Sequence, residues 1–380
     1  MTRRASPIVK GWCPGAYRPM MSGDGLVVRV RPFRASLTPS QTRALCDLAR
    51  RFGNGTLDLT SRANLQIRGV AEQNHPPLLQ ALKDIGLIEA DPHLEGQRNI
   101  LLAADWQKGD LTDRLYAKLL DALPKLPPLP EKMGYALDTG AETQLTSGSA
   151  DFRFERSAEG HLMLRADGAA KGRIVTEAKA MSALTDMIAW FIDTGGSEVG
   201  RMSRQLRSTP LPASWQETPP RPTAPALEPG PFKGGMVLGV PFGSMVADDL
   251  EAMVRLSGVT GMRVMPGRLL WLQGATPQDP VGFVTKPASP LLNTHACPGA
   301  PLCPQATVET RALARRLAGT FTGTLHVSGC AKGCALPRRA DITLTGRNGR
   351  FDLVRNGAPW EEPSTSGLCP DTLQDLSGFA

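Results

Sequence analysis

The sequence predicts an α+β protein that contains a duplicated unit, and three observations carry this prediction. A strand, a helix, a strand, a tight turn and a strand follow one another from Gly25, and the same order begins again at Gly235. The Asn348-Gly349 pair lies between two apolar segments and indicates an antiparallel hairpin. A segment rich in proline separates the two copies. Because β-α-β-β segments are common, coincidence is the competing explanation, and the recurrence favours duplication.

The first copy carries clear local signals. Three strands are expected where apolar residues alternate or cluster, at 25–30, 56–60 and 64–69. Thr38 is a suitable N-cap for the first helix, Pro39 suits its first position, and Gln41 completes a capping box. The expected apolar face of this helix, with one packed thiol beside it, comprises Leu45, Cys46, Leu48, Ala49 and Phe52.

The second copy and the remaining segments repeat these patterns. In the second copy we expect a helix over 248–256 and strands at 235–240, 261–265 and 268–274. Further helices are expected at 78–85, 113–123, 177–192 and 306–317. Further strands are expected at 151–155, 161–164, 325–328, 342–345 and 351–354.

The segment 208–232 contains eight prolines and marks the clearest boundary in the chain. Proline fixes φ and removes a backbone donor, so this segment cannot form a helix or a central strand. We therefore predict a semi-rigid, extended connector between two parts of unequal length.

Composition excludes several classes of protein. With 380 residues the chain is expected to form more than one domain, and 43 Lys+Arg against 36 Asp+Glu give a net charge of +7. No apolar run is long enough to span a bilayer, and the N-terminal MTRRASPIVKGW lacks the apolar core of a secretory signal, so a cytoplasmic protein is expected. Aromatic residues are only 5% and no Lys/Arg block occurs, which argues against nucleic-acid binding. A pocket for a multiply anionic small molecule accounts for the charge equally well.

Four of the seven cysteines form a cluster with the spacing C-x5-C…C-x3-C, at Cys297, Cys303, Cys330 and Cys334. In a reducing compartment such a set indicates a metal centre rather than disulfides. Zinc ribbons favour the spacing C-x2-C, which neither cysteine pair has. The Gly and Pro residues around the cysteines leave backbone N–H groups free to bond the sulfides of a cluster, and Lys332 would offset the negative charge of that cluster. The spacing therefore favours a 4Fe-4S cluster over zinc, with unliganded buried thiols as a third interpretation.

This motif resembles the sulfite and nitrite reductase superfamily, in which the cluster lies beside a sirohaem. The segments 24–29, 60–66 and 97–100 are similar to that superfamily's tetrapyrrole-binding segments. The resemblance implies two ferredoxin-like half-domains that pack together, plus two larger α+β domains. It implies half-domains at 1–75 and 233–284, a first reductase-type domain at 76–207, the connector at 208–232 and a cluster-binding domain at 285–380.

Within the superfamily, the segments 11–15, 21–25, 61–69 and 129–138 are similar to the precorrin-3B synthases of the aerobic cobalamin pathway. The sulfite and nitrite reductases carry two lysines over the sirohaem iron, whereas this chain has Lys132-Met133-Gly134 and lacks the second lysine. Reduction of a small oxyanion needs dense positive charge at the metal, so this departure weakens the reductase interpretation.

The resemblance also implies roles for individual residues, although most arginines of an α+β protein are solvated surface residues. Arg29 and Arg62 would pair with the carboxylates of a tetrapyrrole, with Arg31 as a competing alignment for Arg29. Asn64 and Gln66 alternate along one strand and would face the same cavity. Arg98 and Lys132 would hold the substrate at the reacting centre. Asp91 and His93 resemble part of a facial iron triad, but such a short pair often occurs by chance, and chance is the favoured explanation. His295 is expected to support the cluster loop.

The implied reaction is oxygen-dependent monooxygenation: precorrin-3A would become precorrin-3B by hydroxylation at C20 and closure of a γ-lactone. A 4Fe-4S cluster would deliver electrons, and the family allows a further mononuclear non-haem iron, for which the sequence shows no ligands. Since no G-x-G-x-x-G turn is present, NADH would act through a separate reductase. The alternatives are a sirohaem-dependent sulfite or nitrite reductase and, as a third class, a non-enzymatic electron carrier or redox sensor.

Overall fold

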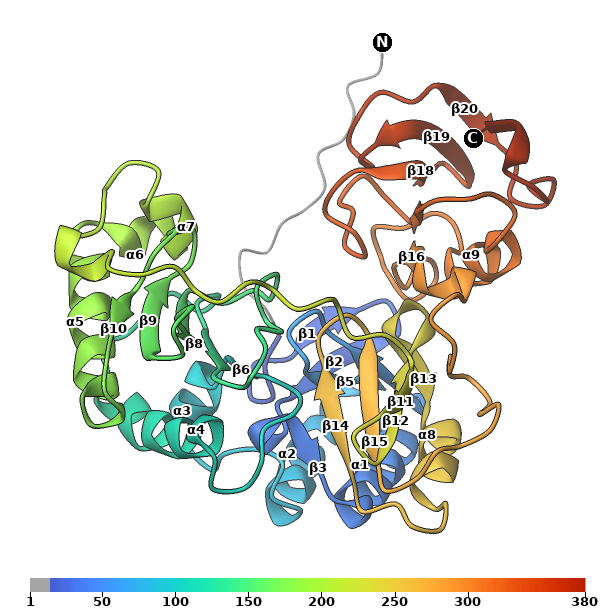
Figure 1. The fold of residues 1–380 in the computed structure, drawn as a ribbon. Coiled ribbons are helices and arrows are strands. Elements are labelled where there is room, and N and C mark those ends of the chain that lie inside the picture. The colour runs from blue at the N-terminus through green and yellow to red at the C-terminus, as the bar shows by residue number, and fades with distance from the viewer. Residues whose placement is uncertain (1–13, 380) are drawn as a thin grey trace.

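The computed structural model describes residues 14–379 and contains four five-stranded sheets, arranged as two ferredoxin-like units in the centre with a larger α+β unit on each side (Figure 1). The first sheet is antiparallel and has the order β1 (Met20–Ser22), β2 (Gly25–Val30), β5 (Leu65–Val70), β4 (Thr56–Leu59) and β13 (Ser244–Val246). The second sheet repeats this order with β11 (Gly230–Phe232), β12 (Gly235–Gly239), β15 (Leu269–Gln273), β14 (Gly261–Met265) and β3 (Ser36–Leu37).

The two outer sheets also share a topology, with two parallel pairings followed by two antiparallel ones. The third sheet comprises β6 (Ile100–Leu102), β7 (Tyr135–Asp138), β8 (Phe152–Arg156), β9 (Leu162–Ala166) and β10 (Arg173–Ile174). The fourth comprises β16 (Thr294–Ala296), β17 (Leu325–Ser328), β18 (Ala340–Arg347), β19 (Arg350–Gly357) and β20 (Thr365–Leu368). The duplication therefore extends over ten strands in each half of the described chain, beyond the single unit whose recurrence the sequence indicated.

Nine α-helices cover these sheets within residues 14–379. The first half contains α1 (Pro39–Phe52), α2 (His75–Asp84), α3 (Pro92–Gln97), α4 (Leu111–Ala122), α5 (Ala180–Asp193), α6 (Gly196–Val199) and α7 (Met202–Gln205). The second half contains α8 (Ala247–Val254) and α9 (Arg311–Leu317). The Thr38–Gln41 capping box predicted for α1 is present, and α1 packs on α8 beneath the two central sheets. None of these helices has the length and apolar character needed to cross a membrane.

A turn with two consecutive left-handed residues marks both copies. Arg34 and Ala35 have φ of 57° and 53°, and Phe242 and Gly243 have φ of 58° and 70°. Each pair directly precedes the short strand that crosses to the other copy's sheet, β3 or β13. Such backbone is costly for residues other than glycine, so its presence in both halves supports a common origin for the two turns.

The helix expected at 306–317 begins only at Arg311, because the preceding residues close the loop that carries Cys297 and Cys303. The Thr310 hydroxyl donates to the Cys297 carbonyl at 2.5 Å, and the Ala300 N–H donates to the Val308 carbonyl at 2.8 Å. Residues 306–310 therefore serve the cysteine loop rather than a helix.

The proline-rich connector predicted at 208–232 forms no α-helix, and its last residues form the edge strand β11. Along its course it makes isolated bridges, from Thr218 to Gly172, from Pro220 to Ser157 and from Thr223 to Thr143. It thus runs over the unit that contains the third sheet before it enters the second sheet (Figure 1).

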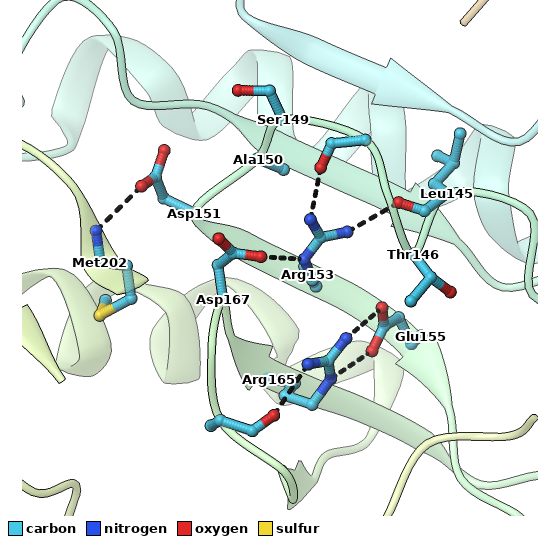
Figure 2. A network of polar contacts seen from close by, with 12 residues as sticks. Leu145, Thr146, Ser149, Ala150, Asp151, Arg153, Glu155, Arg165, Asp167 and Met202 are labelled. Carbon is cyan, nitrogen blue, oxygen red and sulfur yellow. Dashed lines mark hydrogen bonds and ion pairs between the residues drawn. The ribbon is translucent and has the colours of Figure 1, made fainter. Parts of the chain in front are cut away.

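Charged side chains are buried in the third sheet and connect it to its loops (Figure 2). Arg153 on β8 pairs with Asp167 at 2.8 Å and donates to the carbonyls of Leu145 and Gly148. Arg165 on β9 pairs with Glu155 through both carboxylate oxygens. Because buried charges are stable only when paired, the Arg153 contacts hold the backbone at Leu145 and Gly148, in the loop that lies against the Lys132 segment.

Candidate functional site

A cavity of about 660 Å³ lies where the first sheet, the turns of the second copy and the cysteine loops meet. Its volume is in the range of small-molecule sites. The floor comes from β2, β4 and β5, and the walls come from the second half of the chain. The wall residues include Phe242, Gly243, Gly267, Arg268, His295, Cys297, Arg311 and Cys334.

Strand register places a row of polar residues on one face of the first sheet. Asp58 on β4 is paired with Gln66 on β5, and Gln66 is paired with Arg29 on β2. Directly paired residues point to the same face, as do residues two apart on one strand, so Arg68 joins this row. All four residues line the cavity. The sequence pointed to Arg29 and Gln66, whereas Arg68 could have been found from its period-two relation to Gln66.

The cavity wall is strongly basic. Its lining includes Arg29, Arg68, Arg268 and Arg311, and Asp58 is the acidic residue among the lining side chains, so four positive charges and one negative charge leave a formal +3. Burial lowers the pKa of Arg268 to about 10, which leaves the guanidinium protonated at neutral pH. Burial and the nearby Arg268 lower the pKa of His295 to about 3, so this imidazole adds no charge. Such a wall suits a ligand with several carboxylates.

These arginines are held by partners that fix their direction. Arg68 donates to both oxygens of Asp24, at 2.7 and 3.1 Å, and contacts Asp58 at 3.3 Å. Arg311 bridges the two copies, because it donates to Asp58 at 3.1 Å and to the Ser244 hydroxyl at 2.8 Å. Fixed side chains lose little entropy when a ligand binds.

Arg268 is fixed by backbone carbonyls instead of carboxylates. It occupies a left-handed turn with φ of 65° and donates to the carbonyls of Leu292 and Thr294 at 2.6 and 2.8 Å. Neither Arg268 nor Arg311 carries a local sequence signal, since both reach the cavity only through contacts between distant segments.

The four predicted cluster cysteines come together beside this cavity, and Cys297 and Cys334 line it. Burial raises the pKa of the Cys334 thiol to about 11, and the charges of Cys297, Cys330 and Cys303 also raise it. The pKa of Cys330 is raised by burial and, to a smaller extent, by Cys303 and Cys297. These interactions place the four cysteines in one region, where a positive metal centre would remove the repulsion between their thiolates.

Backbone N–H groups point at the cysteine sulfurs. Gly329 donates its N–H to the Cys297 sulfur at 3.2 Å, and the Lys332 N–H bonds Cys330. Within residues 14–379 no three His, Cys, Asp or Glu side chains converge closely enough to bind a single metal ion. Four cysteines in one region, with backbone N–H donors to their sulfurs, suit an iron–sulfur cluster, which four cysteine thiolates hold.

Arg62 meets the Lys132 segment just before the start of strands β7 and β8, and the cavity lining includes neither residue. Arg62 donates to the Lys132 carbonyl at 2.7 Å and to the Ser149 hydroxyl at 3.0 Å. Arg201 donates to the same two oxygens at 3.3 and 3.2 Å, and it also pairs with the buried Asp151 at 2.9 Å. Arg201, which no sequence motif indicates, therefore helps to hold the Lys132 segment.

No side chain has room at the position of the missing second lysine. A Cβ atom at Gly134 would lie 2.6 Å from the Asn99 carbonyl oxygen. Gly134 also accepts the Asp151 N–H and donates to its carboxylate, and the preceding Met133 is buried. The backbone here is closely packed, so a lysine at this position would require the Lys132 segment to move.

Arg98 and Asn64 lie away from the cavity wall. Arg98 is 3% exposed, pairs with Glu95 at 2.5 Å and lies over the Phe33 ring at 3.9 Å. Arg31, the competing alignment for Arg29, belongs to the same buried ion cluster and contacts Glu95 at 3.2 Å. Asn64 is buried in the turn before β5, where its backbone bonds Thr60. Of the two aligned arginines, Arg29 is therefore the one that faces the cavity.

His93 lines a second cavity of about 300 Å³, together with Arg18 and Arg31. The Asp91 side chain accepts the His93 N–H and caps α3. These two residues thus serve a helix start, and no third ligand joins them among the described residues. His295 lies beside Cys297 in the main cavity, consistent with support of the cluster loop.

Comparison with known proteins agrees with this architecture. Residues 18–85 match the nitrite/sulfite reductase ferredoxin-like half domain family. A precorrin-3B synthase from a Sinorhizobium species is 30% identical over 394 residues, which cover 93% of this chain and 84% of the relative. The chain belongs to the precorrin-3B synthase family.

More distant relatives place this precorrin-3B synthase family member in a wider group. A ferredoxin–nitrite reductase from Synechococcus elongatus is 24% identical, over 90% of this chain and 80% of the relative. The structure of the Mycobacterium tuberculosis NirA protein superposes on this chain with a TM-score of 0.62 and 19% sequence identity. The match covers 92% of this chain and 79% of the NirA chain. That likeness shows the fold. The predicted duplicated reductase-like fold and the prediction of an oxidoreductase-type enzyme are confirmed.

Proposed function

We propose that this protein is an oxygen-dependent monooxygenase that converts precorrin-3A to precorrin-3B. One oxygen atom of O2 would enter as a hydroxyl group at C20, and the ring A acetate would close a γ-lactone. Two electrons from NADH, delivered through a separate reductase, would reduce the other oxygen atom to water. The observation that carries the proposal is a cavity with a formal charge of +3 whose wall includes two of the four clustered cysteines.

Cys297, Cys303, Cys330 and Cys334 would hold a 4Fe-4S cluster, which supplies electrons singly when bound. The chain's own residues bind and orient the substrate: Arg29 and Arg311 pair with ring carboxylates, and Gln66 donates or accepts a hydrogen bond between them. We assign no substrate contact to Arg62, Asn64, Arg98 or Lys132, because none of them is among the residues that line the cavity. Since no three ligating side chains converge within residues 14–379, no step is assigned to a mononuclear iron.

The experiment is purification without oxygen, followed by iron and acid-labile sulfide analysis, EPR of the reduced protein and a visible spectrum. We expect equal amounts of iron and sulfide, an EPR signal from a reduced cluster and no Soret band. With precorrin-3A, 18O2 and a reductase, the product should gain one labelled oxygen atom. The pure protein with NADH alone should not turn over.

A sirohaem-dependent sulfite or nitrite reductase is the alternative, since it would use the same cavity and the same four cysteines. The packing at Gly134 counts against it, because that position cannot carry the second cation without rearrangement. Tightly bound sirohaem in acid–acetone extracts, with sulfite reduction driven by methyl viologen, would establish the reductase and refute the monooxygenase. Zinc without acid-labile sulfide would refute both.

A further inference from the structure

The turn between β1 and β2 contacts the loop that joins Cys297 to Cys303. The Leu302 carbonyl of this loop accepts three donors from the first half-domain: the Gly23 N–H at 3.0 Å, the Ser22 hydroxyl at 2.6 Å and the Arg68 guanidinium at 3.4 Å. We call these three donors the Leu302 clamp. Leu302 directly precedes Cys303, so the clamp acts on a backbone group adjacent to a proposed cluster ligand.

The glycine in this clamp is required by close packing. A Cβ atom at Gly23 would lie 2.2 Å from the Pro301 carbonyl oxygen and 3.0 Å from the Leu302 carbonyl carbon. Gly23 is not among the residues with positive φ, so its conformation would suit alanine. Any side chain here would push the backbone of the cysteine loop, which has no flexible side chain to yield in its place.

Arg68 ties the clamp to the cavity. Its guanidinium contacts Asp24 in the same turn, the Ser22 hydroxyl and Asp58 in the cavity floor. Asp58 in turn pairs with Arg311, at the start of the helix that follows the cysteine loop. The loop that bears Cys303 is thus held before its cysteine by the Leu302 clamp and after it through Arg311.

We propose that Ser22, Gly23 and Arg68 are positioning residues for the cluster: they hold the Cys297–Cys303 loop in the conformation that presents Cys303 to the iron. The proposal rests on the proposed cluster. This proposal gives a role to the segment 21–25, which is similar to the precorrin-3B synthases. Within this segment, Ser22 and Gly23 are the residues that donate to the Leu302 carbonyl. Mutation of outer groups that orient metal ligands typically lowers metal affinity by about 10- to 100-fold.

The test compares Gly23→Ala with Gly15→Ala in the full chain, both purified without oxygen. The control has the same chemistry and lies in the same half-domain, but a Cβ at Gly15 would meet nothing closer than 3.9 Å. We expect Gly23→Ala to retain about 10-fold less iron and sulfide than the wild type, because outer-group changes have effects of this size. Gly15→Ala should keep the wild-type content, EPR signal and far-UV circular dichroism.

A second variant tests the proposal even if Gly23→Ala does not fold. Ser22→Ala removes one donor to Leu302 without adding an atom, so the protein should fold and load its cluster, then lose it several-fold faster to a chelator. Wild-type iron content and EPR signal in Gly23→Ala, or a wild-type rate of cluster loss in Ser22→Ala, would overturn the proposal. A wild-type protein without iron and sulfide would instead refute the proposed function.

Discussion

Glu95 is the centre of a buried ion cluster beside the first sheet. Its carboxylate is 1% exposed and pairs with Arg98 at 2.5 Å and Arg31 at 3.2 Å, and it also accepts the Glu89 N–H at 3.0 Å. A buried carboxylate left without its partners carries a desolvation penalty that few other contacts offset. The Arg98 guanidinium therefore has a structural task that is independent of any substrate.

This arrangement predicts that Arg98→Ala lowers the free energy of unfolding by about 3 kcal/mol, because Glu95 loses its closest cation. Urea unfolding followed by circular dichroism measures the effect. Arg18→Ala is the matched control: it breaks an exposed ion pair with Glu131 and should cost less than about 1 kcal/mol. An Arg98→Ala protein with wild-type stability and a raised KM for precorrin-3A would instead identify Arg98 as a substrate-binding residue.

At the level of elements, the two halves exchange edge strands. Strand β13 of the second copy pairs with β4 of the first, and β3 of the first copy pairs with β14 of the second. Arg50 on α1 adds ion pairs to Asp248 and Glu251 on α8, both at 2.6 Å. Each exchanged strand covers an edge that would otherwise be open to aggregation, so neither central sheet is complete without the other half.

The exchanged strands show what the sequence could and could not predict. Helix α1 and strand β2 carry their signals locally, in the Thr38 capping box and in apolar alternation, and both were predicted. Strands β3 and β13 are only two and three residues long and pair with partners more than 180 residues away, so no local pattern marks them. The site divides in the same way: motifs indicated the four cysteines, Arg29 and Gln66, whereas Arg268 and Arg311 reach the cavity only through tertiary contacts.

Strand exchange predicts that a core change in β13 loosens the first half-domain. Met245 is 4% exposed and lies opposite Leu57 of β4, whereas the adjacent Val246 is 50% exposed. Met245→Ala should cost about 3 kcal/mol and accelerate hydrogen exchange at the amides of β4. Val246→Ala should stay within about 0.5 kcal/mol of the wild type. Unchanged exchange in β4 with faster exchange confined to the second copy would show that the halves are stable independently.

Across the whole molecule, pseudo-symmetry produces one open face and one filled face. In the first sheet, Asp58 on β4 lies opposite Ser244 on β13. At the equivalent place in the second sheet, Arg263 on β14 lies opposite Ser36 on β3. Arg263 lies between the rings of Trp106 and Trp271, at 4.1 and 5.0 Å, and donates to the carbonyls of Ala104 and Trp106. Side chains of the protein therefore fill the place in the second copy that corresponds to the cavity. Of the two cavities described above, only the one on the first sheet has the wall with a formal charge of +3.

The assembled wall predicts that a metal-free polycarboxylate porphyrin stabilises the whole molecule. The ligand would bridge the first sheet, the second copy's turns and the cysteine loops, so saturation at 100 times its Kd should add about 2.7 kcal/mol and raise the Tm of the main unfolding transition. Arg311→Gln should reduce this shift, since it removes a cation shared by Asp58 and the cavity, and added salt should weaken binding. Arg347→Gln, whose ion pair with Asp352 lies on β18 and β19, should respond like the wild type. Equal Tm shifts in the wild type and in Arg311→Gln would show that the porphyrin binds elsewhere. Loss of the Tm shift in Arg311→Gln alone would show that the carboxylates are recognised where the two copies meet.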